Sequence, residues 1–357
     1  MTNRTRNSAV ELLRILAMCG VVLLHYNNST IGGGLAFAEG THYAVLAAVE
    51  ALFICAVNVY VLISGYYLCQ TQTRRAGKML ELLAQVILLG PVCYLISCIG
   101  GGGWSLKGLL SSLIPENYFV TLYLVLYVFS PYLNLLFDRL SHRQMYLLTG
   151  LMIAAFSLWV TAVDTLSFLT GYGWNGLSTV SAHGSQRGYS LIQFALMYTL
   201  GAWIRRNEGR LRKVSQPVLA VVLLGSTGGI YLWSWFDNGA AWAYCNPFVI
   251  LSACAALLLC LRKSFQSKIV DSLAKGAFPC YLIHTCLLGW FGIEQAVALP
   301  LPLMLGHAVF TAVVCYLVGW GFSLLWNRFP GRLLSRLGGK FHKIDNLLSI
   351  RAEEISK

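Results

Sequence analysis

The chain has 357 residues, of which 57% are hydrophobic and only 11% are charged, and its formal net charge is +12. This composition is far more apolar than that of a soluble domain, so it excludes a soluble protein. The basic residues fall in short clusters between apolar runs rather than in one stripe, so we expect no nucleic-acid partner. The eleven cysteines lie mostly in or beside the apolar runs and form no CxxC pair, which favours packing over a metal site or disulfides.

Ten apolar runs are candidate spans, and nearly all of them are long enough to cross about 30 Å of hydrocarbon as a helix. They predict an all-α polytopic bundle of about ten transmembrane helices, with residues 1–326 as the bundle and 327–357 as a basic cytoplasmic tail. The predicted spans are residues 8–27, 43–66, 79–99, 118–137, 145–164, 189–204, 217–236, 243–261, 277–297 and 303–325.

The distribution of lysine and arginine predicts the orientation of the bundle. Ten spans put both termini on one side, and nearly all basic residues outside the spans fall on that same side. Only Lys107 and Arg187 fall opposite, while Arg14 lies inside the first span. Cytoplasmic loops carry an excess of Lys and Arg, so both termini are predicted to be cytoplasmic.

Two connections on the outer side are longer than the others. Residues 100–117 are expected to form a re-entrant or interfacial piece anchored by Trp104. Residues 165–188 mix aromatic rings with hydrogen-bonding groups, a mixture that suits a sugar face. Interfacial anchoring explains the same aromatic residues equally well.

The first span contains three ionisable residues, which are costly in a membrane unless they are paired or hydrated. Glu11 and Arg14 are three positions apart and can meet on one helix face, which a purely structural ion pair would also explain. His25 follows Arg14 by eleven positions, which places both within about 20° of one face and roughly 16 Å apart along the axis. His25 is therefore a candidate general base, although a membrane histidine can simply bond a neighbouring helix.

The end of the second span and the loop after it form a candidate site for an anionic ligand. Ser64 and Gly65 allow close backbone approach, and three basic residues follow just outside the membrane, namely Arg74, Arg75 and Lys78. Ordinary positive-inside residues would show the same spacing. Four more residues are candidates for the lining of a pocket, namely Glu50, Asn58, Tyr123 and His284.

Several motifs together resemble the acyltransferase-3 family of membrane acyltransferases, specifically its surface-polysaccharide O-acyltransferase branch. ELLRILAMCGVVLLH is similar to the family's arginine, ten residues, histidine signature, with Arg14 and His25 in the two places. VNVYVLISGYYL is similar to its SGYF-like motif through Ser64, Gly65 and Tyr66. YFVTLYLVLYVFSPYLN, LIQFALMYTLGAWIRR and YLIH also look like family segments, so the resemblance covers residues 8–326. The family's RxxR-like site is matched imperfectly by Arg75 and Lys78.

This resemblance implies a multi-pass enzyme of a bacterial plasma membrane. It would take an acyl group, most often acetyl, from acyl-CoA in the cytoplasm to a hydroxyl of a cell-surface glycan or lipid-linked saccharide. By resemblance His25 would be the essential base or a transient acyl carrier, with Arg14 orienting it or holding the donor and Glu11 beside Arg14. No permanently bound cofactor and no metal are expected, and a homodimer stays open. An exporter of a polysaccharide or lipid-linked sugar is the main alternative, and a catalytically silent scaffold is a third.

Overall fold

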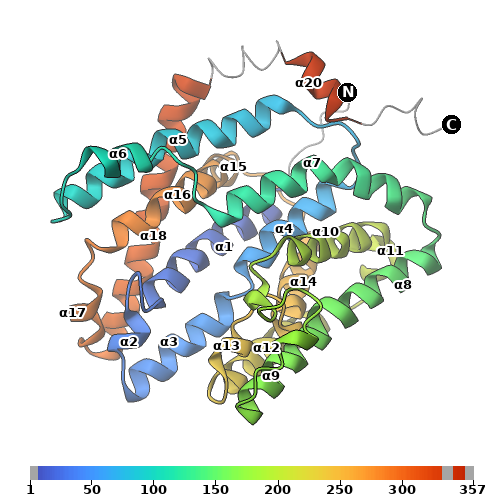
Figure 1. The fold of residues 1–357 in the computed structure, drawn as a ribbon, viewed down its shortest axis with the longest axis horizontal. Helices are drawn as coiled ribbons and strands as arrows, with labels where there is room; N and C mark the ends of the chain where they lie inside the picture. The colour runs from blue at the N-terminus through green and yellow to red at the C-terminus, as the bar shows by residue number, and fades with distance from the viewer. Residues whose placement is uncertain (1–6, 332–340, 350–357) are drawn as a thin grey trace. The chain divides into compact units, whose positions relative to one another are not determined.

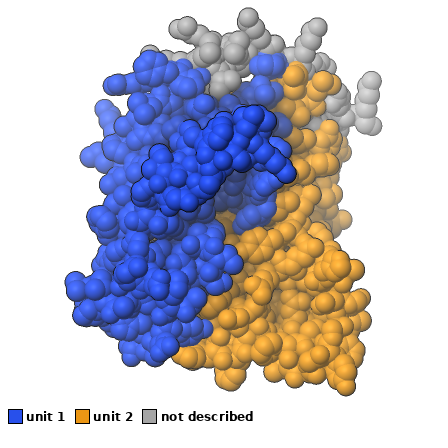
Figure 2. Space-filling model, turned by 60° about the vertical axis from the view of Figure 1, so that its left-hand side comes forward, with its two compact units in different colours: residues 1–53, 76–120, 264–342 blue, residues 54–75, 121–263, 343–357 orange. Residues whose placement is uncertain are grey.

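The computed structural model describes residues 7–331 and 341–349, and every regular element in them is a helix. Figure 1 shows the helices in chain order. The chain divides into two compact units, shown in separate colours in Figure 2. Unit 1 comprises residues 1–53, 76–120 and 264–342, and unit 2 comprises residues 54–75, 121–263 and 343–357. The expected all-α membrane protein is thus confirmed.

Unit 1 is built around α1, α16 and α18, which pack on one another. The beginning of α7 (Tyr118–Arg139), up to Val120, also belongs to it. Besides this part of α7, its elements are α1 (Ser8–Asn27), α2 (Gly34–Phe37), α3 (Gly40–Phe53), α5 (Ala76–Ile99), α6 (Leu106–Ser111), α15 (Lys268–Leu273), the 3₁₀ turn η4 (Ala274–Gly276), α16 (Ala277–Leu288), α17 (Ile293–Val297) and α18 (Leu301–Arg328).

Unit 2 is built around two helix pairs, α4 with α10 and α12 with α14. Its elements are α4 (Ala56–Leu68), most of α7 (Tyr118–Arg139), α8 (His142–Ile153), the π-helical η1 (Ala154–Leu158), α9 (Trp159–Thr170), the 3₁₀ turns η2 (Asn175–Leu177) and η3 (Gln186–Gly188), α10 (Leu191–Arg206), α11 (Glu208–Leu211), α12 (Gln216–Ser234), α13 (Asn238–Ala241), α14 (Pro247–Leu261) and nearly all of α20 (His342–Leu347).

Seven helical segments of the described chain are long and apolar enough to cross a membrane. They are Ser8–Asn27, Gly40–Leu68, Ala76–Ile99, Tyr118–Arg139, His142–Thr170, Gln216–Ser234 and Leu301–Arg328, and each coincides with a predicted span. The other three predicted spans correspond to shorter helices, α10, α14 and α16 followed by α17. The count of ten and the cytoplasmic side of the termini stay predictions.

Some element boundaries differ from those that hydropathy indicated. The second predicted span is interrupted at Ile54 and Cys55, between α3 and α4. The fifth continues through η1 to Thr170, because residues 165–170 remain apolar enough to extend the helix, so the outer connection is shorter than expected. Residues 100–117 contain the short helix α6, and Trp104 is 65% exposed. The predicted tail, residues 327–357, lies partly outside the described residues.

Small residues let the central helices of unit 1 approach closely. A side chain at Gly319 of α18 would collide with the backbone of Cys280 on α16, and one at Gly276 would collide with Trp320. Such close approach is the usual way in which membrane helices associate, since lipid supplies no hydrophobic driving force between them.

The α1 helix begins after a capping residue, Asn7, whose side chain accepts a hydrogen bond from the Ala9 N–H.

Unit 2 repeats this device between α4 and α10. A Cβ at Gly65 would lie 2.2 Å from the carbonyl oxygen of Tyr198, and one at Gly201 would lie 2.3 Å from that of Leu62. The two glycines therefore allow the helix axes to come together.

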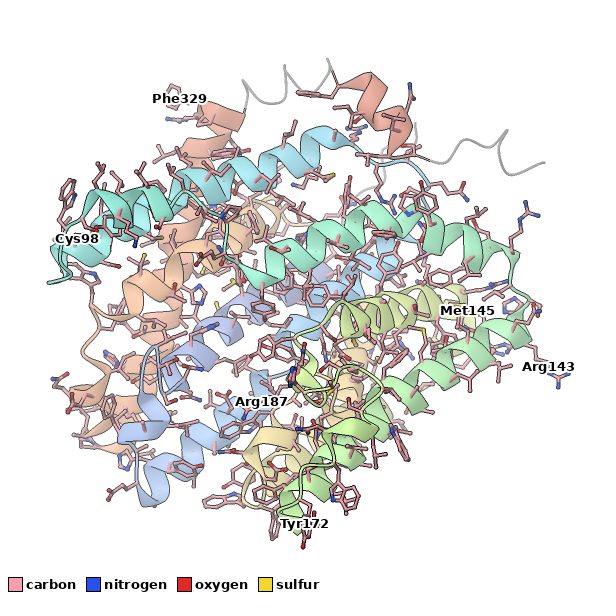
Figure 3. All side chains as sticks on the ribbon, in the orientation of Figure 1. Cys98, Arg143, Met145, Tyr172, Arg187 and Phe329 are labelled. Carbon is pink, nitrogen blue, oxygen red and sulfur yellow. The ribbon has the colours of Figure 1, made fainter. Side chains whose placement is uncertain are left out.

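In the same unit α8, η1 and α9 follow one another as one long helical segment. In Figure 3, Arg143 and Tyr172 mark its two ends.

Candidate functional site

Two histidines from distant parts of the sequence meet in unit 1. His25 near the end of α1 and His284 in α16 face each other, with ring centroids 4.7 Å apart and ring planes inclined by 63°. The Nε2 atom of His284 lies 3.0 Å from Nδ1 of His25. Each Nδ1 also lies near a carbonyl oxygen of the preceding turn, at 2.9 Å from Val21 for His25 and 3.0 Å from Cys280 for His284.

These contacts define which ring nitrogens carry hydrogen. A carbonyl oxygen can only accept, so the Nδ1 atoms of His25 and His284 must both donate. The His284 Nε2 then has a lone pair and accepts from His25 Nδ1, whose hydrogen is shared with Val21. Any other assignment points a lone pair at a carbonyl oxygen. As a result, Nε2 of neutral His25 carries a lone pair and is the atom able to take a proton.

A cavity of about 350 Å³, here called the unit 1 cavity, lies among α1, α5, η4, α16 and α18. Its lining combines charged, amide, hydroxyl and aromatic side chains, and all of them belong to unit 1. The lining residues are Glu11, Arg14, Lys78, Glu81, Leu82, Gln85, Ala274, Lys275, Phe278, Pro279, Ser323, Trp326 and Asn327.

The unit 1 cavity and the histidine pair lie along the same two helices. Arg14 of α1 and Phe278 of α16 line the cavity, while His25 and His284 lie further along these helices. Eleven residues of helix at 1.5 Å each separate Arg14 from His25 by roughly 16 Å along the axis. His25 is not among the described residues that line the cavity, so the two features are neighbouring parts of unit 1 rather than one pocket.

Two ion pairs in the lining join residues three positions apart on one helix. Arg14 Nη1 lies 3.3 Å from Glu11 Oε2, and Lys78 Nζ lies 3.2 Å from Glu81 Oε2. Sequence reasoning anticipated the first pair, but it assigned Lys78 to a cluster with Arg74 and Arg75. In the structure Lys78 pairs with Glu81 in unit 1, and the two arginines are residues of unit 2.

Arg74 is held by its own unit. Only 2% of it is exposed, and its Nε donates to Ser130 Oγ over 2.7 Å. Its Nη1 donates to the carbonyl oxygens of Thr71 and Thr73, each over 2.9 Å. These bonds give Arg74 a structural role at the end of α4. Arg75 is exposed, and its backbone N–H donates to the hydroxyl of Tyr127.

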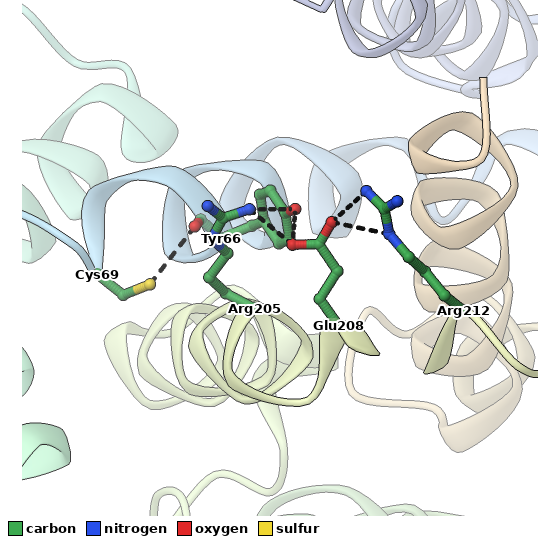
Figure 4. A network of polar contacts seen from close by, with 5 residues as sticks. All are labelled: Tyr66, Cys69, Arg205, Glu208 and Arg212. Atoms are coloured by element: carbon green, nitrogen blue, oxygen red, sulfur yellow. Dashed lines mark hydrogen bonds and ion pairs between the residues drawn. The ribbon is translucent and has the colours of Figure 1, made fainter. Parts of the chain in front are cut away.

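The three predicted residues of the SGYF-like motif make intramolecular contacts in unit 2. Ser64 Oγ donates to the Tyr60 carbonyl oxygen, and Gly65 packs against α10 as described above. The Tyr66 hydroxyl donates to Glu208 Oε2 over 2.7 Å and accepts from Arg205 Nη1 over 2.6 Å. Figure 4 shows how Glu208 also binds Arg212, so that this network ties α4 to α10 and α11.

The network around Glu208 changes the acidity of that carboxyl group, which lies outside the membrane-spanning segments. Burial by itself would raise the pKa of Glu208. The hydrogen bond from Tyr66 and the charges of Arg205 and Arg212 outweigh burial, and they hold the pKa of Glu208 below its usual value. The carboxylate is thus a stable anchor for both guanidinium groups.

The remaining predicted pocket residues are distributed over both units. Glu50 in unit 1 is 9% exposed, and its Oε2 accepts from Asn27 Nδ2 over 2.9 Å. Asn58 in unit 2 is 1% exposed, and it binds the Tyr244 carbonyl oxygen and Gln193 Nε2. Tyr123 is partly exposed on α7 in unit 2. Among the six predicted residues in unit 1, the structure brings His25 together with His284, and Glu11 and Arg14 together with Lys78.

Sequence reasoning missed several residues of the unit 1 cavity. Gln85 could have been recognised from the sequence, because a polar residue within an apolar span indicates a functional position. Lys275 and Trp326 were indistinguishable from a positive-inside lysine and an interfacial tryptophan. Glu81 was hidden for a similar reason, since it follows a basic loop at the edge of a span.

Comparison with known proteins agrees with the motif resemblance. A family model described as an acyltransferase domain, Acyl_transf_3, matches residues 7–324. Searches of curated proteins and of solved structures find no match. The matched range includes α1 with Arg14 and His25, α16 with His284, and nearly all of α18. The chain therefore belongs to the acyltransferase-3 family of membrane acyltransferases.

Proposed function

We propose that this membrane acyltransferase moves an acyl group, in the first instance acetyl, from acyl-CoA to a hydroxyl of a cell-surface glycan or lipid-linked saccharide. The enzyme would act in a bacterial plasma membrane and take its donor from the cytoplasm. The family supports acyl transfer. The proposed donor and class of acceptor are supported by the resemblance of the chain's motifs to those of the surface-polysaccharide branch.

The observation that carries this proposal is the arrangement of His25 and His284. The Nδ1 hydrogen of His25 is donated to the Val21 carbonyl oxygen and to His284 Nε2, so Nε2 of neutral His25 keeps a lone pair. A general base needs both a lone pair and a fixed ring, and a second group that orients the base is the usual way to obtain them. His284 is thus a positioning residue for His25.

Acyl transfer then proceeds by attack on the thioester followed by collapse of a tetrahedral intermediate. The acceptor hydroxyl gives its proton to Nε2 of His25 while its oxygen attacks the thioester carbonyl carbon. The tetrahedral intermediate collapses, the carbon–sulfur bond breaks, and the coenzyme A thiolate takes the proton from the imidazolium. During this cycle the positive His25 ring donates from Nδ1 to the lone pair of His284, which stabilises the charge. In the alternative in which His25 carries the acyl group, the acyl-histidine intermediate would form at the same Nε2 atom.

Transfer of radiolabelled acetyl from acetyl-CoA to surface polysaccharide tests the proposal, with the purified protein in lipid nanodiscs. His25→Ala should lower the rate at least about a hundredfold, the lower end of what a general base contributes. His307→Ala is a matched control, because His307 is another histidine of unit 1 and bonds Tyr26 and Phe291 rather than His25. Full transfer by His25→Ala would refute the mechanism. Export of saccharide without any turnover of acetyl-CoA would favour the exporter alternative.

A further inference from the structure

The unit 1 cavity has an excess of positive charge. Arg14, Lys78 and Lys275 face Glu11 and Glu81, so the lining carries three cations and two carboxylates. Each carboxylate is already paired with a cation of its own helix. Within the described part of the chain Lys275 forms no ion pair. The lining therefore offers one ammonium group whose charge no acidic residue balances.

Two buried polar atoms in the same lining also lack partners. Trp326 is 4% exposed and Gln85 is 6% exposed. Neither Nε1 of Trp326 nor Oε1 of Gln85 has a hydrogen-bond partner in the part of the chain that the structure describes. A buried polar group without a partner is costly, so a ligand that supplied the missing hydrogen bond would gain binding energy. The indole N–H can only donate and the amide oxygen can only accept.

We infer that the unit 1 cavity binds a phosphate-bearing ligand that also carries N–H or O–H donors. The phosphate would contact Lys275 and the Trp326 N–H, with Arg14 and Lys78 adding positive charge around it. A ligand donor group would reach Gln85 Oε1, and the rings of Phe278 and Trp326 would cover apolar parts of the ligand. Acyl-CoA satisfies this description through its phosphates and its amide and ribose groups, and a phospholipid headgroup shares the phosphate.

This inference rests on the proposed function for the identity of the donor, but not for the site itself. Arg14 and His25 belong to the same helix, roughly 16 Å apart along its axis, and this is the distance that the pantetheine arm of a donor held by its phosphates in the unit 1 cavity would have to span. The cavity would then replace the basic loop of Arg74 and Arg75 as the main anchor of the donor, in accord with the engagement of Arg74 within unit 2.

The test measures binding rather than transfer. The full chain in nanodiscs is titrated with coenzyme A by calorimetry, and phosphatidylglycerol retained by the detergent-purified protein is measured by native mass spectrometry. Lys275→Gln should weaken coenzyme A binding about tenfold, as expected for the loss of one charged contact, and Trp326→Phe should weaken it severalfold. Binding to the unchanged protein should also fall with added salt.

Matched controls are available in the same unit. Lys268→Gln removes an equal charge from an exposed position on α15, and Trp290→Phe alters a tryptophan that is 54% exposed. Both control variants should bind coenzyme A normally. If Lys275→Gln and Trp326→Phe instead release phosphatidylglycerol and leave coenzyme A binding intact, the phosphate in the cavity is that of a lipid.

If neither variant changes either ligand, the inference is overturned, whether or not the protein transfers acyl groups. Conversely, loss of coenzyme A binding in Lys275→Gln stands even if no acceptor is ever acetylated. Failure of the binding site and failure of the proposed function are therefore distinguishable.

Discussion

His284 Nε2 lies 3.0 Å from His25 Nδ1, although 259 positions separate the two residues in the chain. This contact converts an isolated membrane histidine into an oriented one. The orienting group is a neutral ring that accepts a hydrogen bond, instead of the carboxylate found in serine hydrolases.

Replacement of His284 should therefore affect catalysis through His25. His284→Leu removes the acceptor for His25 Nδ1, and we expect kcat to fall about ten- to a hundredfold with little change in KM. The double variant with His25→Ala should be no slower than His25→Ala alone, because the two residues act as one unit. Steady-state kinetics of the four proteins measures the coupling. Additive losses would show that His284 acts independently of His25.

Glu81 should weaken anion binding in the unit 1 cavity, because it neutralises Lys78 over 3.2 Å. Glu81→Gln leaves the lining with three cations and one carboxylate, so coenzyme A should bind severalfold more tightly at low salt. The gain should shrink at high ionic strength, since the pair is partly exposed. Calorimetry at two salt concentrations measures both effects. Glu116→Gln, an exposed residue of unit 1 outside the lining, should change neither.

Gln85 is expected to lower the stability of the ligand-free protein and to strengthen the binding of coenzyme A. Its buried Oε1 has no partner in the described structure, so Gln85→Leu should raise the free energy of unfolding of the ligand-free protein by on the order of 1 kcal/mol, and its thermal midpoint slightly. The same variant should show a smaller rise of the midpoint when coenzyme A is added. A thermal melt with and without coenzyme A decides the matter. A variant that is less stable without ligand and equally stabilised by it would contradict the assignment of this amide to the ligand.

Arg74 and Arg75 are neighbours with opposite expected behaviour. Arg74→Ala removes a buried guanidinium together with its bonds to Ser130 Oγ and the Thr71 carbonyl oxygen, and should destabilise the protein by about 2–4 kcal/mol. Arg75→Ala removes an exposed side chain and should change stability by less than about 0.5 kcal/mol. Unfolding of both variants in detergent gives the comparison. Equal stability of the two would mean that the bonds of Arg74 are not formed in the membrane protein.

Glu208 should give unit 2 a stability that depends on pH. The pKa of this carboxyl group lies below its ordinary value of 4.5 in the folded protein, because the hydrogen bond from Tyr66 and the two arginines outweigh burial. Its contribution is therefore fully present above the ordinary pKa and is lost as the pH falls through the lowered one. The thermal midpoint should drop between pH 5 and more acidic values, roughly the window of this titration. Glu208→Gln should flatten that drop and lower the midpoint at neutral pH.

Much of the fold could be predicted from the sequence, because lipid imposes simple rules on a chain that crosses it. Backbone groups must be satisfied within helices, so apolar runs reveal where helices lie, and seven predicted spans coincide with helices long enough to cross. The helical period also predicts that Arg14 and His25 lie on the same face of one helix. The motifs around these two residues indicate the family to which the chain belongs. These are properties of single segments, which local composition determines.

Only the tertiary structure decided which residues from different helices meet. Hydropathy treats Lys275 and Arg74 alike, yet packing leaves Lys275 on a cavity and surrounds Arg74 with acceptors. The contact of His25 with His284 likewise depends on how α1 packs against α16. The position of α16 is in turn set by its close packing on α18, which Gly319 allows. Helix periodicity defines a direction along one segment, but the rotation of each helix against its neighbours follows from side-chain packing across the whole unit.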